Sequence, residues 1–272
     1  MRQAMIFAAG LGTRLKPLTD SIPKALVSVG GQTLLDRTIQ RLRGQGYSRL
    51  VVNVHHFAEL IKDHVAQNAD YQRLVSISDE SDELLDTGGG LKKAATLFDD
   101  EEPILIHNVD ILDNVDYDWF RRQHLDDEDA VLLVSRRPTQ RYLLFDNAMR
   151  LVGWVNTATG EIRSPFEWVK HPDDATLDTD ALQLKIWRGT TEIVLNMFAF
   201  SGIHSFSPRL FRLMDQFPRR FGIMDFYLQT CHRTRIYGCV KDNLKILDVG
   251  KLESLAAAEE FVTQQESSSE MR

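Results

Sequence analysis

Hydrophobic runs of strand length alternate with segments of helical periodicity along most of the chain. The strand-like runs are short, apolar and rich in β-branched residues, at positions 4–9, 49–54, 74–78, 103–106 and 130–135. Between them, apolar residues recur at helical intervals at positions 32–43, 55–65, 91–97 and 117–125. Strands that alternate with helices predict an α/β fold with a doubly wound, Rossmann-like sheet.

This alternation stops between residues 136 and 195. Short apolar runs at 142–145 and 151–155 are separated by turn signals, a spacing typical of β-hairpins. We therefore expect a small antiparallel β addition, which makes the sheet mixed. Apolar runs at 197–204 and 244–250 predict two further strands.

A last helix is predicted at 251–262. The composition turns polar from 263 to 272, with three serines in a row, which predicts a disordered tail. No linker or repeat divides the chain before that point, so we expect a single domain over residues 1–262.

Composition limits the classes of partner. The chain has 272 residues with a net charge of −7, which argues against a nucleic-acid partner. No apolar run approaches the ~18 residues of a membrane span, so no membrane contact is expected. The two cysteines, Cys231 and Cys239, offer neither metal-ligand spacing nor a disulfide framework. We expect a cytoplasmic protein that is a monomer or a small homo-oligomer.

The first strand ends at two closely spaced glycines and is followed by cations. Gly10 and Gly12 come directly after the apolar run, and Arg14, Lys16 and Lys24 come next. Glycine lets backbone amides turn toward a bound anion without a side chain in the way. The cations add charge where the amides supply direction. This stretch predicts a phosphate site.

Other glycine-rich sites fit the stretch poorly. A dinucleotide-binding loop has a third glycine near position 15, where Leu15 stands, and an acidic residue after the second strand, where Asn53 and His55 stand. The Gly-Lys-Ser/Thr of a Walker loop is absent. A secretory signal is excluded because its apolar part, 4–11, is too short and Arg14 follows it.

The longer pattern is Gly-x-Gly-x-Arg-x-x-Pro-x-Thr, followed by Pro-Lys. It closely resembles the signature of the sugar-1-phosphate nucleotidyltransferases, at Gly10, Gly12, Arg14, Pro17, Thr19, Pro23 and Lys24. The resemblance implies the Rossmann-like nucleotidyltransferase fold, an NTP and a sugar 1-phosphate as substrates, and Mg²⁺ as cofactor. It places Arg14 at the β- and γ-phosphates and Lys24 at the α-phosphate and the attacking phosphate. Ala25 departs from the family, which often has a second proline there.

A second glycine-rich motif, Asp86-Thr87-Gly88-Gly89-Gly90, precedes a predicted helix. Glycines before a helix suggest another close approach of backbone to ligand. In the resembling family this loop holds the nucleotide base, and its form here is most similar to the N-acetylmuramate-1-phosphate uridylyltransferases. The expected nucleotide-binding residues are Ala9, Gly10, Gly12, Thr13, Thr87, Gly88 and Asn108. The acidic residues around the motif are expected to be mostly solvated surface: Asp79, Glu80, Asp82, Glu83 and Asp86.

Two carboxylates are predicted at strand ends. Asp110 follows the run at 103–106, and Asp248 ends the run at 244–250. Ligands of doubly wound sheets bind at the carboxyl ends of strands, and Mg²⁺ usually takes one or two protein carboxylates. We therefore expect Asp110 and Asp248 to share one Mg²⁺, with Asp110, Lys24 and Arg14 as the catalytic residues. Val109 replaces the family's usual glycine, so this strand end is expected to be shaped differently.

The sugar side is less defined. Gly202 lies in a run that resembles the family's strand entering the sugar pocket, and the resemblance places segment 136–195 on this side. Lys170 and Lys185 are both candidates for binding the sugar phosphate, and a third possibility is that neither of them binds it. The second motif favours UTP and N-acetylmuramic acid 1-phosphate as substrates. GTP with mannose 1-phosphate, and an NTP with glucose 1-phosphate, remain alternatives. A non-catalytic nucleotide-sugar-binding protein is the alternative of another class, indicated by Val109.

Overall fold

The computed structural model describes residues 1–270 and shows a mixed sheet as its centre. The strands of its central part follow one another in the order β5 (Val75–Asp79), β4 (Arg49–Val54), β1 (Gln3–Phe7), β6 (Ile104–Asn108), β14 (Thr191–Phe206), β8 (Ala130–Ser135) and β15 (Ile236–Val240). The first four are parallel, whereas β14 runs antiparallel to both β6 and β8. The predicted α/β class with a mixed sheet is confirmed.

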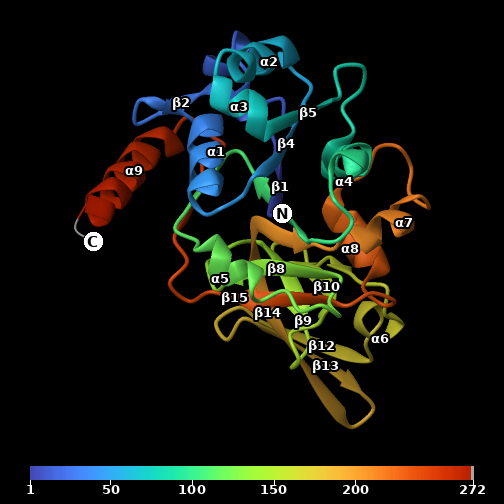
Figure 1. The fold of residues 1–272 in the computed structure, drawn as a ribbon. Coiled ribbons are helices and arrows are strands. Elements are labelled where there is room, and N and C mark those ends of the chain that lie inside the picture. The colour runs from blue at the N-terminus through green and yellow to red at the C-terminus, as the bar shows by residue number, and fades with distance from the viewer. Residues whose placement is uncertain (271–272) are drawn as a thin grey trace.

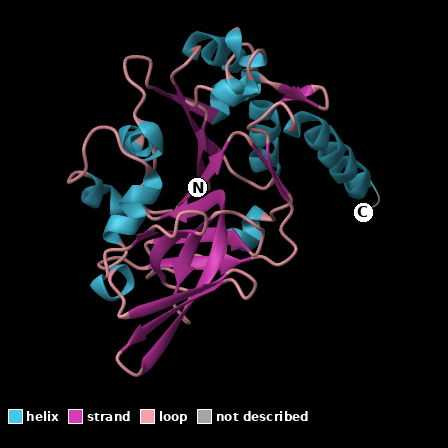
Figure 2. Ribbon diagram, turned by 180° about the vertical axis from the view of Figure 1, so that it is seen from behind, coloured by secondary structure: helices cyan, strands magenta, loops and turns pink. Residues whose placement is uncertain are grey.

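Helices cover both faces of this sheet (Figures 1 and 2). On one side lie α1 (Leu34–Gly44), α2 (Ala58–Ala66), α3 (Ala69–Leu74), α5 (Tyr117–Arg121) and α9 (Ser254–Glu270). On the other side lie α4 (Asp86–Lys93), α7 (Phe211–Met214) and α8 (Ile223–Thr230).

Strand β1 shows why the sheet is doubly wound. Successive side chains of a strand point to opposite faces. Ile6 belongs to the hydrophobic cluster that contains Ile39 of α1, and Met5 belongs to the cluster that contains Leu91 of α4. All five residues of β1 are buried, as expected for a strand covered on both faces.

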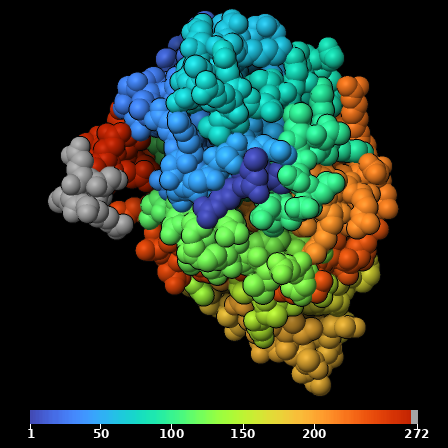
Figure 3. Space-filling view, in the orientation of Figure 1, coloured from blue at the N-terminus to red at the C-terminus, as the bar shows by residue number. Residues whose placement is uncertain are grey.

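The antiparallel addition lies where the sequence predicts it. It consists of β9 (Arg141–Phe145), β10 (Leu151–Asn156), β11 (Ile162–Arg163), α6 (Glu167–Lys170), β12 (Asp174–Asp178) and β13 (Gln183–Arg188). The long strand β14 joins it to the centre, because β14 pairs with β13, β9, β8 and β6 in turn. The turn between β13 and β14, where Arg188 pairs with Thr191, projects at the bottom of Figures 1 and 3.

Several short elements complete the fold. Two small sheets pair β2 (Ser28–Val29) with β3 (Gln32–Thr33) and β7 (Ile111–Asp113) with β16 (Ile246–Asp248). Single 3₁₀ turns lie at Thr13–Leu15, Leu18–Asp20, Lys24–Leu26, Ala95–Leu97 and Pro208–Leu210. No helix among residues 1–270 combines the length and the apolar character needed to cross a membrane.

Some element boundaries differ from the sequence predictions. The helix predicted at 32–43 begins at Leu34, because the hydroxyl of Thr33 accepts from the Asp36 amide (3.0 Å) and caps it. Helix α2 begins at Ala58 and not at residue 55, and α9 begins at Ser254 and not at residue 251. Helix α5 ends at Arg121, short of residue 125.

The end of the chain also differs. Helix α9 continues past residue 262 to Glu270, where the sequence predicted a disordered tail from 263. Long-range contacts explain this. Glu266 pairs with Arg37 (3.3 Å), and the side-chain Nε2 of Gln265 donates to the Asp113 carbonyl oxygen (2.6 Å). The predicted domain limit therefore falls inside a helix, while residues 271–272 of the predicted tail lie outside the described residues.

Candidate active site

The carboxyl ends of β1 and β6 open onto a cavity of about 400 Å³. Because these strands are parallel neighbours, their ends meet at one edge of the sheet, where doubly wound folds bind ligands. The cavity is lined by Phe7, Ala8, Gly10, Leu11, Gly12, Thr13, Arg14, Lys24, Thr87, Asn108, Val109, Asp110 and Gly250. The predicted residues that the structure gathers on this wall are Gly10, Gly12, Thr13, Arg14, Lys24, Thr87, Asn108 and Asp110.

Residues 8–14 form the glycine-rich loop that the sequence predicts as a phosphate site, called the phosphate loop below, and its shape is fixed. Gly12 has φ 63°, and a Cβ there would lie 3.0 Å from Thr19 Cγ2 and 3.1 Å from Lys24 Cβ. The Thr19 hydroxyl donates to the Gly12 carbonyl oxygen (2.8 Å) and holds the turn. The amides of Gly10, Leu11 and Gly12 donate no hydrogen bond within residues 1–270. They are therefore available to an anion.

Lys24 and Asp110 form an ion pair beside the loop, on the same cavity lining. Both side chains are largely covered, with exposed fractions of 11% for Lys24 and 20% for Asp110. Lys24 is held at the start of a 3₁₀ turn, in which the Leu26 amide donates to the Pro23 carbonyl oxygen (2.9 Å). The pair offers a cation to a phosphate through Lys24 and an anion to a metal ion through Asp110.

Asp248 lies differently from its prediction. It is exposed and ends β16, which pairs with β7 in a small sheet of its own and is not a buried strand of the central sheet. The Val249 amide donates to the Asp110 carbonyl oxygen (2.8 Å), so the two carboxylate-bearing segments are still neighbours. Asp248 lines an adjoining cavity of about 340 Å³, which shares Arg14 and Gly250 with the first.

Gly250 explains how Arg14 reaches this region. A Cβ at Gly250 would lie 2.6 Å from Asp248 Oδ1 and 2.8 Å from Arg14 Nη2. Only glycine leaves room for both groups. Within residues 1–270 no group of three or more His, Cys, Asp or Glu side chains is arranged as a metal site. A Mg²⁺ would therefore depend on Asp110, Asp248 and oxygens of the ligand, and its presence stays a prediction.

The three successive glycines do not precede a helix but lie inside α4, which corrects the sequence interpretation. A Cβ on Gly88 would clash with the Phe221 ring, and one on Gly89 would clash with the Arg219 carbonyl oxygen. The Gly88 and Gly89 amides both donate to the Phe221 carbonyl oxygen (2.9 and 3.1 Å). The glycines thus allow close packing of α4 against the segment before α8. Gly88 is not on the cavity wall, and its contact with a nucleotide stays a prediction.

Thr87 does face the cavity, and its side chain is fixed from behind. Its hydroxyl oxygen accepts a hydrogen bond from the Ile223 amide at the start of α8 (2.9 Å). The remaining hydroxyl proton is therefore free to donate to a ligand acceptor. Helix α8 thereby sets the position of one residue of the candidate site.

Glu80 is fully buried, which contradicts the prediction of a mostly solvated acidic stretch for this residue. Its carboxylate accepts from Asn53 Nδ2 (2.7 Å) and from the Leu85 amide (3.2 Å). Burial raises the pKa of this carboxyl, and the two hydrogen bonds oppose that shift. Asp82, Glu83 and Asp86 are exposed, as expected.

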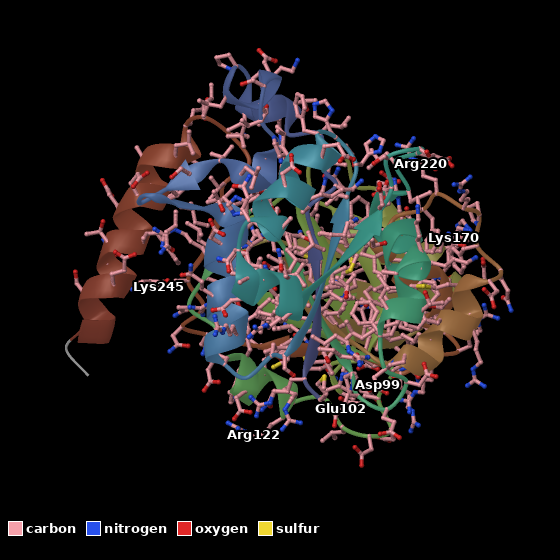
Figure 4. All side chains as sticks on the ribbon, turned by 45° about the horizontal axis from the view of Figure 1, so that its top comes forward. Asp99, Glu102, Arg122, Lys170, Arg220 and Lys245 are labelled. Atoms are coloured by element: carbon pink, nitrogen blue, oxygen red, sulfur yellow. The ribbon has the colours of Figure 1, made fainter. Side chains whose placement is uncertain are left out.

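The predicted sugar side is only partly gathered at the cavity. Gly202 has φ 81° at an irregularity in β14, and a Cβ there would lie 2.9 Å from the Nδ2 of Asn108, which lines the cavity. Neither Lys170 nor Lys185 lines it. Lys170 is exposed on α6 and lies on the same side of the molecule as Arg220 (Figure 4). The assignment of a sugar-phosphate-binding lysine therefore stays open between Lys170, Lys185 and neither.

Sequence reasoning missed other lining residues. Phe7, Ala8 and Leu11 belong to the same loop and strand as the predicted ones, so the loop pattern itself could have included them. Val109 was named only as a departure, yet it lines the cavity, and its amide donates to the Phe7 carbonyl oxygen (3.1 Å). Its φ is not positive, so this strand end has no need of glycine. Ala9 is buried and does not line the cavity.

Comparison with known proteins fits this geometry. The chain is 47% identical over 110 residues to N-acetylmuramate alpha-1-phosphate uridylyltransferase of Caulobacter vibrioides, which covers 39% of this chain and 45% of the relative. It is 35% identical over 115 residues to the enzyme of the same name from Neisseria meningitidis, covering 42% and 49%. The chain thus spans about half the length of the curated relatives it matches.

The fold likeness extends over nearly the whole chain. The inositol-1-phosphate CTP transferase from T. maritima superimposes with a TM-score of 0.70, covering 97% of this chain and 95% of that one at 15% identity. At this identity the likeness concerns the fold alone. The sequence profile of the Nucleotidyl transferase family matches residues 3–265. With the phosphate loop, Lys24 and Asp110 on one cavity wall and a match of this extent, the chain belongs to the nucleotidyl transferase family.

Proposed function

We propose that the protein transfers a nucleotidyl group from an NTP to a sugar 1-phosphate, forming an NDP-sugar and releasing pyrophosphate. The observation that carries the proposal is the shared cavity wall of the phosphate loop and the Lys24–Asp110 pair. The wall offers free loop amides, two cations and a carboxylate to a polyphosphate. UTP and N-acetylmuramic acid 1-phosphate are the proposed substrates, supported by the names of the two relatives and by the Asp86-Thr87-Gly88-Gly89-Gly90 motif.

The chemistry explains why the wall needs no general base. The nucleophile is an oxygen of a phosphate monoester, which is already anionic at neutral pH. Among the described lining residues there is no histidine and no cysteine. The difficulty is that one anion attacks the phosphorus of another, and fixed cations around that phosphorus lower this barrier. We assign Lys24 to the α-phosphate and the attacking phosphate, and the exposed Arg14 to the β- and γ-phosphates.

The donor set fits Mg²⁺. Carboxylate and phosphate oxygens are the ligands this ion prefers, and it usually needs only one or two carboxylates from the protein. Asp110 would hold it, with Asp248 on the neighbouring segment joined by the Val249–Asp110 hydrogen bond. When bound, the ion supplies charge neutralisation to the phosphates. The Lys24 ammonium, now paired with Asp110, would be the cation that contacts the attacking phosphate.

A matrix of four NTPs against several sugar 1-phosphates, scored by pyrophosphate release, tests the proposal. We expect the highest kcat/KM with UTP and N-acetylmuramic acid 1-phosphate. Lys24→Ala should abolish most of this turnover, and its matched control is Lys16→Ala, because Lys16 lies on the same segment but pairs with Asp20 (3.1 Å) in solvent. Preference for GTP, or turnover only with another sugar, refutes the substrates and leaves the reaction class. Nucleotide binding without pyrophosphate release from any pair refutes catalysis.

A further inference from the structure

A chain of buried hydrogen bonds connects the phosphate loop with the segment that carries Thr87. The Ala8 amide donates to Asn53 Oδ1 (2.8 Å), and Asn53 Nδ2 donates to Glu80 Oε1 (2.7 Å). The other carboxylate oxygen of Glu80 accepts from the Leu85 amide (3.2 Å). Ala8 and Thr87 both line the cavity, so this hydrogen-bond relay links two parts of the cavity lining.

The donors and acceptors of this relay can be assigned without ambiguity. The Ala8 amide can only donate, so the facing atom of Asn53 must be its oxygen. The Asn53 nitrogen then faces Glu80 as a donor, and the Leu85 amide is a second donor. Glu80 must therefore present an acceptor on each of its two oxygens. A carboxylate does this, whereas a carboxamide of the same shape has only one acceptor atom.

The relay is also rigid. Glu80 is 0% exposed and Asn53 is 2% exposed. The Glu80 amide donates to the Val54 carbonyl oxygen (2.7 Å), and His55 Nδ1 donates to the Glu80 carbonyl oxygen (2.7 Å). Gly90 closes the site from α4, because a Cβ there would lie 2.5 Å from Glu80 Oε1 and 2.9 Å from Asn53 Nδ2. The carboxylate has no room to turn away from its partners.

We propose that Glu80 is a positioning residue, which sets the distance between the phosphate loop and Thr87 through Asn53 and Leu85. The inference rests on the proposed function, because the ligand that spans the two segments is the NTP. The phosphates bind at the Ala8 end and the base binds at the Thr87 end. Glu80 touches neither, and it acts only through the spacing of the groups that do.

Variants that exchange the hydrogen-bond donor and acceptor between Asn53 and Glu80 test this role. Glu80→Gln puts an NH₂ group against either Asn53 Nδ2 or the Leu85 amide, so one hydrogen bond is lost. Asn53→Asp keeps the bond from Ala8 but sets a second carboxylate against Glu80. In the double variant the introduced glutamine donates to the introduced aspartate and still accepts from Leu85, so the whole relay is restored with reversed polarity. Asp82→Asn, on the exposed part of the same stretch, is the matched control.

The measurement is the Kd for UTP by isothermal titration calorimetry, with the KM for the sugar 1-phosphate and the melting temperature beside it. Each single variant should raise the Kd for UTP about tenfold, the effect of one buried hydrogen bond. The double variant and Asp82→Asn should stay within about threefold of wild type, by the same scale. The KM for the sugar 1-phosphate should stay unchanged in every variant.

Three outcomes overturn the inference. The first is that the single variants fold and melt at a lower temperature, yet bind UTP with the wild-type Kd. Glu80 would then have a structural role only. The second is that the double variant folds but binds UTP about tenfold more weakly than wild type. This result refutes the hydrogen-bond relay even where a single variant does not fold. If wild-type protein binds none of the four NTPs, the proposed function fails first and this inference fails with it.

Discussion

Replacing Gly89 with alanine sets two effects of known sign against each other. Alanine is favoured over glycine inside a helix by about 1 kcal/mol. The new methyl group, however, would lie closer than 3.0 Å to the Arg219 carbonyl oxygen and 3.1 Å from Leu85 Cβ. A backbone oxygen cannot rotate away as a side chain can, so α4 or the segment before α8 must move.

The magnitude follows from these two terms. Overpacking of this kind typically costs about 1–3 kcal/mol, which exceeds the gain in helix propensity. A shift of α4 also weakens the hydrogen bond from the Gly89 amide to the Phe221 carbonyl oxygen (3.1 Å). We expect the free energy of unfolding to fall by about 1–2 kcal/mol, which is a fall of a few degrees in melting temperature for a chain of this size.

Urea denaturation at fixed pH measures this difference. Gly44→Ala is the matched control, because Gly44 is also helical, at the end of α1, and nothing lies within 4 Å of the Cβ it would gain. There the helix propensity acts alone, and the stability should rise by up to ~1 kcal/mol. If Gly89→Ala proves as stable as Gly44→Ala, α4 does not pack against Arg219 and Phe221 as described, and the packing explanation of the three glycines is refuted.

Lys24→Ala should lower kcat about 100- to 1,000-fold without unfolding the protein, since one preorganised charge at a transferring phosphoryl group contributes about 3–4 kcal/mol; near-normal kcat in a steady-state assay would remove Lys24 from catalysis. Asp248→Asn should raise the Mg²⁺ concentration needed for half-maximal activity, and an unchanged Mg²⁺ titration would exclude a shared site with Asp110. Burial lowers the pKa of His204 to about 3, and its Nδ1 lies 2.7 Å from the Tyr227 hydroxyl. Because the unfolded chain takes up a proton below its ordinary pKa of about 6.5 that the folded state refuses, stability should fall as the pH drops from 6.5 toward 3. In His204→Gln, the free energy of unfolding measured by denaturation should fall less between pH 7 and pH 4.5 than it does in wild type. An equal fall in the two proteins would contradict this.

The sequence predicts those features whose cause is local. The phosphate loop depends on glycine backbone freedom and on nearby cations, and both are visible within residues 10–24. The doubly wound class follows from the alternation of strand and helix patterns. The two faces of β1 are both apolar because both are covered, which a continuous apolar run already indicates.

Features set by distant partners escaped prediction. Gly88 and Gly89 were expected before a helix and lie inside one, because sequence shows the freedom of glycine but not the contacts with Phe221 and Arg219 that require glycine there. Glu80 sits in an acidic stretch that looks like surface, and its burial depends on Asn53, far away in the chain. For Asp248, the strand was predicted but its partner was not, since β7 is only three residues long.

The continuity of β14 restricts how the antiparallel addition can be exchanged between relatives. The strand places Leu195 and Met197 in the core of the addition and then continues into the central sheet beside β6. Because side chains alternate along a strand, one inserted residue in the outer half would turn both side chains away from that core. Insertions there must come in pairs, or must be absorbed at the irregular stretch between Phe200 and His204, where Gly202 already departs from strand geometry. A chimera that joins a foreign hairpin at this glycine can absorb an odd change of length there, whereas one joined at residue 195 keeps the alternation only if the length is unchanged or changes by two residues.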